Sequence, residues 1–229
     1  MRSKEWHLEG LAQIPGCGRD VRVAVLDTGI AFPAHENWAV EEREAFRLPY
    51  PEDRDGHGTH VAGILLSVAP AVHLISITLD EGSPQSYQTA FQLARERSAR
   101  ILNLSGGLRK PDVAVAAGAR ALFAAGVLLV CAAGNEGPLG FRCPAGLPEV
   151  LTVGARRADG TRANFSGPAA EIWAPGVDIW SREIPSGFGF RTGTSQAAAV
   201  VSGVAARLLE FEPELTVAEL KQHLLRIEW

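Results

Sequence analysis

The chain has 229 residues, a formal net charge of −4 and a charged fraction of 21%, which are ordinary values for a globular protein. The small negative charge gives no reason to expect nucleic acid or an anionic membrane as a partner, and no apolar run reaches the ~18 residues of a membrane span. No apolar segment follows the basic residues at the N-terminus, so we expect no secretory signal here. This favours a cytoplasmic location, with a processed secreted form as the alternative.

The chain carries three cysteines, Cys17, Cys131 and Cys143. They are too few for a disulfide framework and lack the paired spacing of a zinc site. We expect buried free thiols, with a contact between Cys131 and Cys143 as the alternative.

Short β-branched runs alternate with helical patterns along the chain, which predicts parallel βαβ units in a single α/β domain spanning 1–229. Residues 31–54 look irregular, apart from a short helix near 40–46. A helix begins near Thr59, just after His57. In chain order, strands are expected at 22–26, 72–79, 101–104, 127–131, 150–153 and 171–173. Further helices are expected at 85–97, 112–124, 195–209 and 217–225.

Four polar residues sit where a predicted strand ends or a predicted helix begins: Asp27, His57, Asn135 and Ser195. In a parallel sheet these ends share one edge, so an acid, a base, an amide and a nucleophile could meet there and carry out acyl transfer. Taken singly, each has a structural interpretation as well. Asp27 could cap a turn, and Ser195 could be a helix N-cap.

His60 follows His57 by less than one helical turn, which raises the question of a metal site. No third ligand lies at helical spacing, so we expect no metal and interpret His60 as a hydrogen-bonded structural histidine.

Several motifs together resemble those of subtilisin-family (subtilase) serine proteases, in the family's order and over residues ~6 to ~225. They are Val-Ala-Val-Leu-Asp27-Thr-Gly, His57-Gly-Thr-His-Val-Ala-Gly, Leu104-Ser-Gly-Gly, Ala-Ala-Gly-Asn135-Glu-Gly, Ala174-Pro-Gly and Gly-Thr-Ser195. The order Asp, His, Ser along the chain is the one that subtilisins have.

The resemblance implies a three-layer α/β/α fold with a mostly parallel, seven-stranded sheet. It implies an Asp27–His57–Ser195 triad, an oxyanion hole formed by the Asn135 amide and the Ser195 N–H, and a peptide or protein substrate bound as an added strand. The residues implied in substrate binding are Gly82, Ser83 and Pro84 on one wall, Leu104, Ser105 and Gly106 on the other, and Ala133, Gly134 and Arg142.

The sequence departs from the family at several of these places. The residues after the His57 helix run straight on, with no room for the family's tight calcium loop, so we expect no calcium there and no cofactor. Arg142 stands near the floor of the primary specificity pocket, where it could fill the pocket, favour an acidic side chain, or be a surface arginine of a shortened loop. Pro84 removes a backbone donor from one wall. The bond before Pro144 is expected to be cis.

Gln196 and Ala199 replace the methionine and proline that the family usually has after the serine. A changed nucleophile position could alter how water and amines compete for an acyl-enzyme. The leading interpretation is a serine endopeptidase. The alternatives are a peptide-maturation transpeptidase or macrocyclase and a catalytically silent peptide-binding domain. We see no pro-segment ahead of the motif-bearing part, which leaves open a mature fragment or a domain that folds unaided.

Overall fold

A computed structural model describes residues 14–32, 40–45, 53–80, 82–140 and 142–229, and at 40–45 it describes the backbone alone. A seven-stranded sheet runs through the molecule in the order β2-β3-β1-β4-β5-β6-β7, and every neighbouring pair is parallel. The strands are β1 (Arg22–Asp27), β2 (Val40–Ala45), β3 (His73–Thr78), β4 (Ile101–Leu104), β5 (Leu128–Ala132), β6 (Val150–Arg156) and β7 (Ile172–Pro175).

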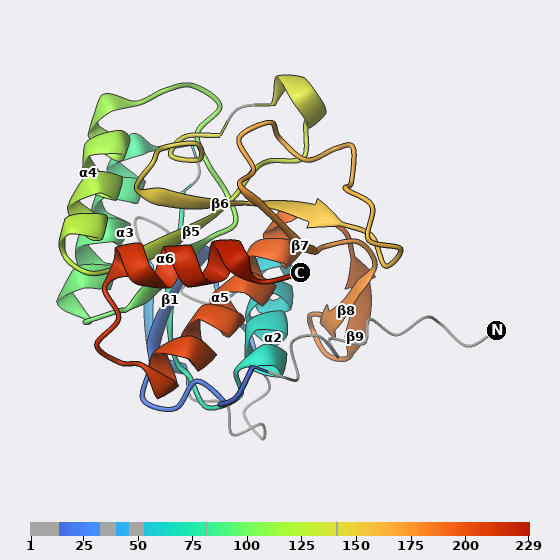
Figure 1. Cartoon of the computed structure of the whole chain (residues 1–229), viewed down its shortest axis with the longest axis horizontal. Helices are drawn as coiled ribbons and strands as arrows, with labels where there is room; N and C mark the ends of the chain where they lie inside the picture. The colour runs from blue at the N-terminus through green and yellow to red at the C-terminus, as the bar shows by residue number, and fades with distance from the viewer. Residues whose placement is uncertain (1–13, 33–39, 46–52, 81, 141) are drawn as a thin grey trace.

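The sheet is buried on both faces, because its strands are apolar at successive positions rather than at every second one. In β1, Val23 and Val25 point into one core, and Ala24 and Leu26 point into the other. Helices α3 (Pro84–Glu96) and α4 (Val113–Ala124) cover one face. Helices α2 (His57–Val68), α5 (Thr194–Phe211) and α6 (Val217–Arg226) cover the other, which gives the three layers seen in Figure 1.

Helix α5 crosses the middle of its layer and is buried at every position from Thr194 to Ala206. Small residues allow this close packing. A Cβ atom added at Gly203 would lie 2.7 Å from Cβ of Val68, so α2 and α5 can approach this closely only at a glycine. The packing fixes the start of α5, which carries Ser195, relative to α2, which begins at His57.

Two parts of the fold differ from what the sequence predicts. The helix expected near 40–46 is wrong for the described residues, which form the edge strand β2. Glu and Arg favour helix locally, but the backbone of β3 offers hydrogen-bonding partners that a helix would leave unpaired. Residue 46 lies outside the described residues. A β-hairpin of β8 (Ile179–Arg182) and β9 (Phe188–Arg191) was not predicted at all.

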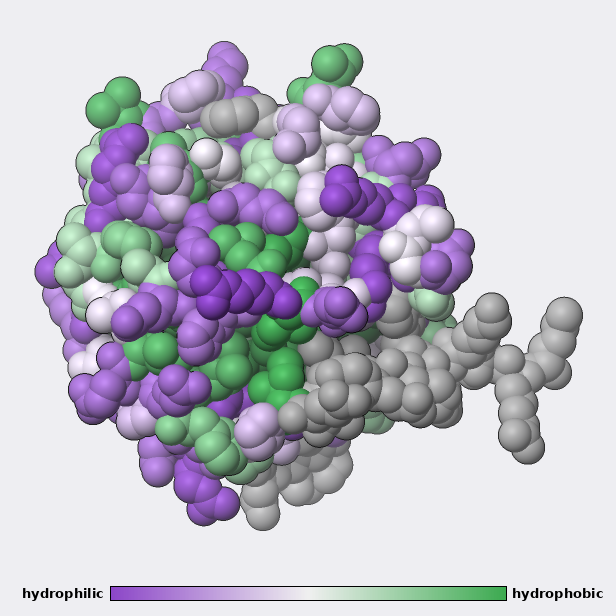
Figure 2. Space-filling model, viewed as in Figure 1, coloured by the Kyte–Doolittle hydropathy of each residue, from purple (hydrophilic) through white to green (hydrophobic). Residues whose placement is uncertain are grey.

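The remaining strands and helices lie where the sequence places them, within a few residues. Helix α6 begins with a capping box between Thr216 and Glu219. The outer surface on the side of the molecule where α6 lies mixes hydrophilic and hydrophobic residues (Figure 2). All three cysteines are free, as expected, but only Cys131 and Cys143 are buried, and Cys17 is half-buried. The bond before Pro144 is cis, as expected. Among the described residues, no helix combines the length and the hydropathy that a membrane crossing requires.

Candidate active site

The site lies at the carboxyl edge of the two central strands. Leu26 of β1 pairs with Leu104 of β4, so the residues that follow them, Asp27 and Ser105, stand side by side on neighbouring strands. The carboxylate of Asp27 contacts His57, and the carbonyl of Ser105 accepts a hydrogen bond from Ser195. One strand edge therefore gathers residues from four distant parts of the chain.

Asp27 and His57 form the central polar contact of this edge. Oδ1 of Asp27 lies 2.7 Å from Nδ1 of His57 and also accepts a hydrogen bond from the N–H of Thr28. The Asp27 side chain is 3% exposed and that of His57 is 29% exposed. The approach depends on Gly58, where an added Cβ would lie 2.1 Å from the carbonyl oxygen of Gly29. The carboxylate thus holds Nδ1 as the protonated nitrogen and leaves Nε2 free to accept a proton.

The electrostatic surroundings favour the charged form of His57. Burial lowers the pKa of His57, but the negative charge of Asp27 and its hydrogen bond together outweigh burial, so the pKa is raised above its ordinary 6.5. Arg191 opposes this shift by a smaller amount and Asp55 adds to it. The site therefore stabilises the imidazolium that forms when His57 takes a proton.

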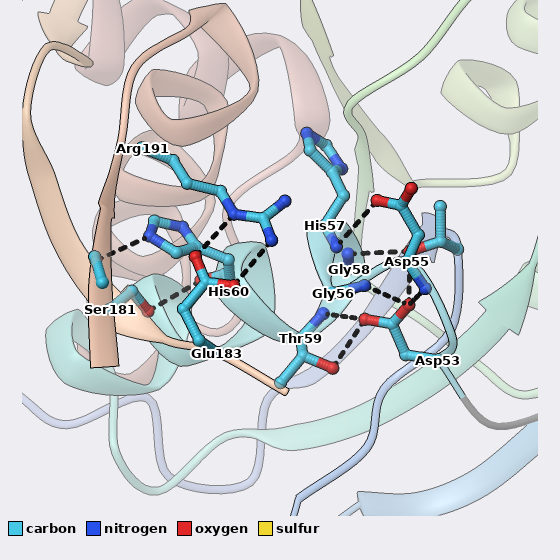
Figure 3. A network of polar contacts seen from close by, with 12 residues as sticks. Asp53, Asp55, Gly56, His57, Gly58, Thr59, His60, Ser181, Glu183 and Arg191 are labelled. Carbon is cyan, nitrogen blue, oxygen red and sulfur yellow. Dashed lines mark hydrogen bonds and ion pairs between the residues drawn. The ribbon is translucent and has the colours of Figure 1, made fainter. Parts of the chain in front are cut away.

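Asp53 holds the loop that carries His57, and sequence reasoning missed it. Its buried carboxylate accepts five hydrogen bonds: three on Oδ1, from the Thr28 hydroxyl and the N–H groups of Asp55 and Gly56, and two on Oδ2, from the N–H and hydroxyl of Thr59 (Figure 3). The Thr28 hydroxyl in turn accepts the N–H of Gly58. A carboxylate four residues before His57, next to a helix start, was the signal available in the sequence.

Burial raises the pKa of Asp53, but the hydrogen bonds from Thr59, Gly56 and Thr28 outweigh burial and hold the pKa below its ordinary 3.8. The carboxylate is therefore charged at neutral pH. It connects the turn after β1 to the start of α2 and so fixes the two segments that bring Asp27 and His57 together.

Ser195 is the second residue of α5, where backbone N–H groups have no partner within the helix. Its side chain does not cap the helix, because the N-cap position is Gly193 and no side chain caps it. In this rotamer the hydroxyl donates to the carbonyl of Ser105 at 3.0 Å. Among the described residues the hydroxyl forms no hydrogen bond with His57, so transfer of its proton to His57 requires the Ser195 side chain to turn from Ser105 toward the imidazole.

The Asn135 side chain is oriented by the residue before Ser195. Oδ1 of Asn135 accepts hydrogen bonds from the N–H of Thr194 at 2.9 Å and from its hydroxyl at 3.0 Å. With the oxygen held in this way, the amide nitrogen is left to donate. Asn135 is exposed, so this donor is accessible to a ligand at the start of α5.

A cavity of about 80 Å³ adjoins Ser195, small beside the roughly 300–1,000 Å³ of ordinary ligand pockets. Arg142 lines it and forms an ion pair with Glu136. An added Cβ at Gly107 or at Gly134 would lie 2.9 Å from an Arg142 side-chain carbon, so Arg142 packs against both glycines. At 18% side-chain exposure it is no free surface arginine. The complete lining is Ser105, Gly106, Gly107, Ala132, Gly134, Asn135, Arg142, Thr194 and Ser195.

Five residues predicted to bind substrate do not line this cavity, and two of them belong to the core. Leu104 is fully buried within β4, and Ala133 is 1% exposed with its N–H bound to the carbonyl of Val153. Their side chains belong to the core, because strand ends continue the apolar packing of the sheet right up to the site.

The segment Gly82–Pro84 forms the start of α3. Ser83 is its N-cap and accepts the N–H of Ser86, and Pro84 takes the first helical position, where a missing N–H costs least. Gly82 and Pro84 face a second, larger groove with Gly107 and Arg142. Gly82 and Pro84 therefore lie next to the cavity and not within it, and Ser83 lines neither hollow.

His60 lies on α2 beneath the β8–β9 hairpin. Its Nε2 is 3.2 Å from the carbonyl oxygen of Gly189, and Ser181 donates to its backbone carbonyl (Figure 3). Burial lowers the pKa of His60 to about 4, so the neutral ring donates to Gly189. Among the described residues, no group of three or more His, Cys, Asp or Glu side chains could hold a metal.

The geometry gathers a hydroxyl, an imidazole held by a carboxylate, and an oriented amide donor at the edge of a parallel sheet, the set needed for acyl transfer. Comparison with known proteins agrees with this class of site. Residues 18–227 match the model of the subtilase family. The chain belongs to the subtilase family of serine proteases, whose substrates are peptides or proteins.

Among curated relatives, the chain is 33% identical over 224 residues to M-protease of Shouchella clausii, covering 90% of this chain and 58% of M-protease. The chain thus spans little more than half the length of that relative. Among solved structures, it is similar to a cold adapted subtilisin-like serine proteinase, with a TM-score of 0.81 and 26% identity over 90% of this chain and 81% of that one. It is also similar to the prenylagaramide maturation protease PagA, with a TM-score of 0.75 and 29% identity over 94% and 86% of the two chains.

Proposed function

We propose that this chain is a serine endopeptidase that hydrolyses peptide bonds through an acyl-enzyme. The observation that carries the proposal is the 2.7 Å contact between Asp27 and His57, at the strand edge that also holds Ser195. Membership of the subtilase family supports it.

In the proposed reaction, Oγ of Ser195 attacks the carbonyl carbon of the substrate while its proton passes to Nε2 of His57. The amide nitrogen of Asn135 and the N–H of Ser195 donate to the oxyanion. His57 then gives the proton to the departing amine as the C–N bond breaks, and Asp27 stabilises the imidazolium in between. Water, deprotonated by His57, releases the acyl group.

The experiment is product analysis by mass spectrometry after incubation with a mixed peptide library. We expect cleavage by the native chain and none by Ser195→Ala. The control is Ser186→Ala, which removes an exposed hydroxyl from the turn of the β8–β9 hairpin. Equal cleavage by native chain and Ser195→Ala would refute the proposal.

A second candidate is a peptide-maturation transpeptidase or macrocyclase on the same fold. It is favoured by the similarity to the maturation protease PagA and by Gln196 and Ala199 at positions where the family usually has methionine and proline. The same library incubated with an amine nucleophile separates the two candidates. Amide products favour the transferase, and acids alone favour the hydrolase.

We propose that neither reaction needs a cofactor and that the family's tight calcium loop is missing. Helix α2 ends at Val68, and four residues, 69–72, connect it to β3. So short a connection leaves no room for an inserted loop.

A further inference from the structure

A groove of about 630 Å³ continues from the cavity beside Ser195. The two hollows share Gly107 and Arg142. One wall of the groove is the start of α3, with Gly82 and Pro84, and the other wall is formed by residues 107–112. We call it the basic groove. The backbone of Leu108 exchanges two hydrogen bonds with that of Cys143, which fixes residues 107–112 against Arg142.

The lining of the basic groove carries an excess of positive charge. Of the residues that the structure describes, Arg109, Lys110 and Arg142 line it, together with the carboxylate of Asp112. That carboxylate already accepts the N–H groups of Ala114 and Val115 as the N-cap of α4.

The three cations of the groove differ in what surrounds them. Arg142 is neutralised by its ion pair with Glu136. Arg109 and Lys110 are exposed, and neither forms an ion pair with any residue in the described part of the chain. The uncompensated charge of the groove is therefore that of Arg109 and Lys110.

The position of the groove fixes which part of a substrate would lie in it. His57 donates its proton to the departing amine, so the residues after the cleaved bond leave on the His57 side. Neither His57 nor Asp27 lines the groove, which instead joins the cavity of Ser195 and Asn135. An extended peptide that continues from the cavity into the groove would therefore place there side chains that precede the cleaved bond.

We propose that the basic groove selects peptide substrates with an acidic side chain among the residues that precede the cleaved bond. This inference rests on the proposed function. Arg109 and Lys110 supply the attraction. The neutralised Arg142 only bounds the cavity beside Ser195, so the preference for an acid lies upstream of that cavity rather than in it.

The test compares peptide pairs that differ only by Glu or Gln at one of these upstream positions. For the native chain at low ionic strength, we expect kcat/KM to be about 2- to 5-fold higher for the Glu peptide than for the matching Gln peptide at the best-placed position, as exposed ion pairs give. Added salt should reduce the ratio. The double variant Arg109→Gln, Lys110→Gln should bring the ratio near one, and Arg109→Glu, Lys110→Glu should favour a matching Lys peptide.

The matched control is Arg95→Gln, Arg226→Gln, which removes the same charge at two exposed positions outside the groove and should keep the preference for Glu. A ratio near one for the native chain, with efficient cleavage of the Gln peptide, would overturn this inference and leave the proposed function intact. If neither peptide is cleaved, the proposed function fails. In that case, binding of the same peptides to Ser195→Ala is measured by fluorescence anisotropy. Tighter binding of the Glu peptide than of the Gln peptide supports the inference, and equal binding overturns it.

Discussion

Thr194 holds the Asn135 side chain by two hydrogen bonds to one atom, its carbonyl oxygen Oδ1. The residue before the proposed nucleophile thus orients the proposed oxyanion donor. The amide is placed before any substrate arrives, so no reorganisation is needed as negative charge develops.

Replacing Asn135 by Ala should therefore lower kcat by about 100- to 1,000-fold with little change in KM. The scale comes from a subtilisin in which one oxyanion amide was removed. Asn135 is exposed, so we expect the fold to survive. Thr194→Val, which removes one of the two hydrogen bonds, should give a smaller loss. Steady-state kinetics on one peptide checks both, and an unchanged kcat in Asn135→Ala would exclude the amide from the reaction.

The pH dependence of activity should follow the raised pKa of His57. His57 must be neutral to accept the serine proton, so kcat/KM should fall as the pH drops through a midpoint above 6.5. Arg191 lowers this pKa, and Glu183, its ion-pair partner, would be left uncompensated without it. Arg191→Gln should therefore move the midpoint to higher pH, while Arg226→Gln should not. A midpoint that falls in Arg191→Gln would contradict the electrostatic account.

Asp53→Asn should destabilise the fold, because an amide would direct N–H donors at the N–H groups now bound by the carboxylate. We expect a loss of about 2 kcal/mol or more in the free energy of unfolding at neutral pH, measured in urea on a Ser195→Ala background to prevent self-digestion. Asp55→Asn, which affects an exposed carboxylate with one hydrogen bond, is the matched control.

The same difference should depend on pH. The pKa of Asp53 is lower in the folded state than its ordinary 3.8, so its stabilisation is present above that value and is lost as the pH falls through the folded pKa. The difference in unfolding free energy between Ser195→Ala with Asp53 intact and Ser195→Ala with Asp53→Asn should therefore narrow in acid. If this difference widened in acid instead, the pKa of Asp53 would be raised by folding and not lowered, contrary to our assignment.

Arg142→Ala should enlarge the cavity beside Ser195, since Arg142 lines it and packs over Gly107 and Gly134. We expect peptides with a large apolar residue just before the cleaved bond to gain in kcat/KM relative to those with alanine there. Glu136→Gln is the control, because it keeps the size of the side chain at 136 but breaks the ion pair with Arg142. It shows whether a change in preference comes from the lost ion pair or from the enlarged cavity. No change in size preference in Arg142→Ala would show that Arg142 does not bound this subsite.

Chelation should leave the thermal midpoint unchanged. A bound metal would stabilise the folded state by mass action, and its removal would lower the midpoint. The α2–β3 connection has no inserted loop, so we expect the same melting curve with and without EDTA. A fall of several degrees that calcium reverses would place a calcium site elsewhere in the chain.

The sequence predicts the sheet and most helices because their signals are local. Buried parallel strands are continuous apolar runs, and α6 carries its own capping box. Strand β2 is the counterexample. Its Glu- and Arg-rich residues favour helix, and only the unpaired backbone of β3 makes them a strand.

Within the site, the sequence could predict Asp27, His57, Asn135 and Ser195, because motifs mark them at strand ends and helix starts. It could not predict the contacts between motifs. The Asp53 carboxylate, the Thr194–Asn135 bonds and the Glu136–Arg142 pair join residues whose distances depend on the folded loops. Leu104 and Ala133 were predicted to bind substrate, but they do not line the cavity, because a side chain at the end of a strand can point into the core instead of the site.

The central claim is that His57, held by Asp27, activates Ser195, and reaction with a fluorophosphonate tests it most directly. We predict one covalent adduct per chain, located on Ser195 by peptide mapping, no adduct in Ser195→Ala, and a severe loss of labelling rate in His57→Ala. No adduct on the folded native chain, or an adduct on Ser195 that forms equally fast without His57, would contradict the account.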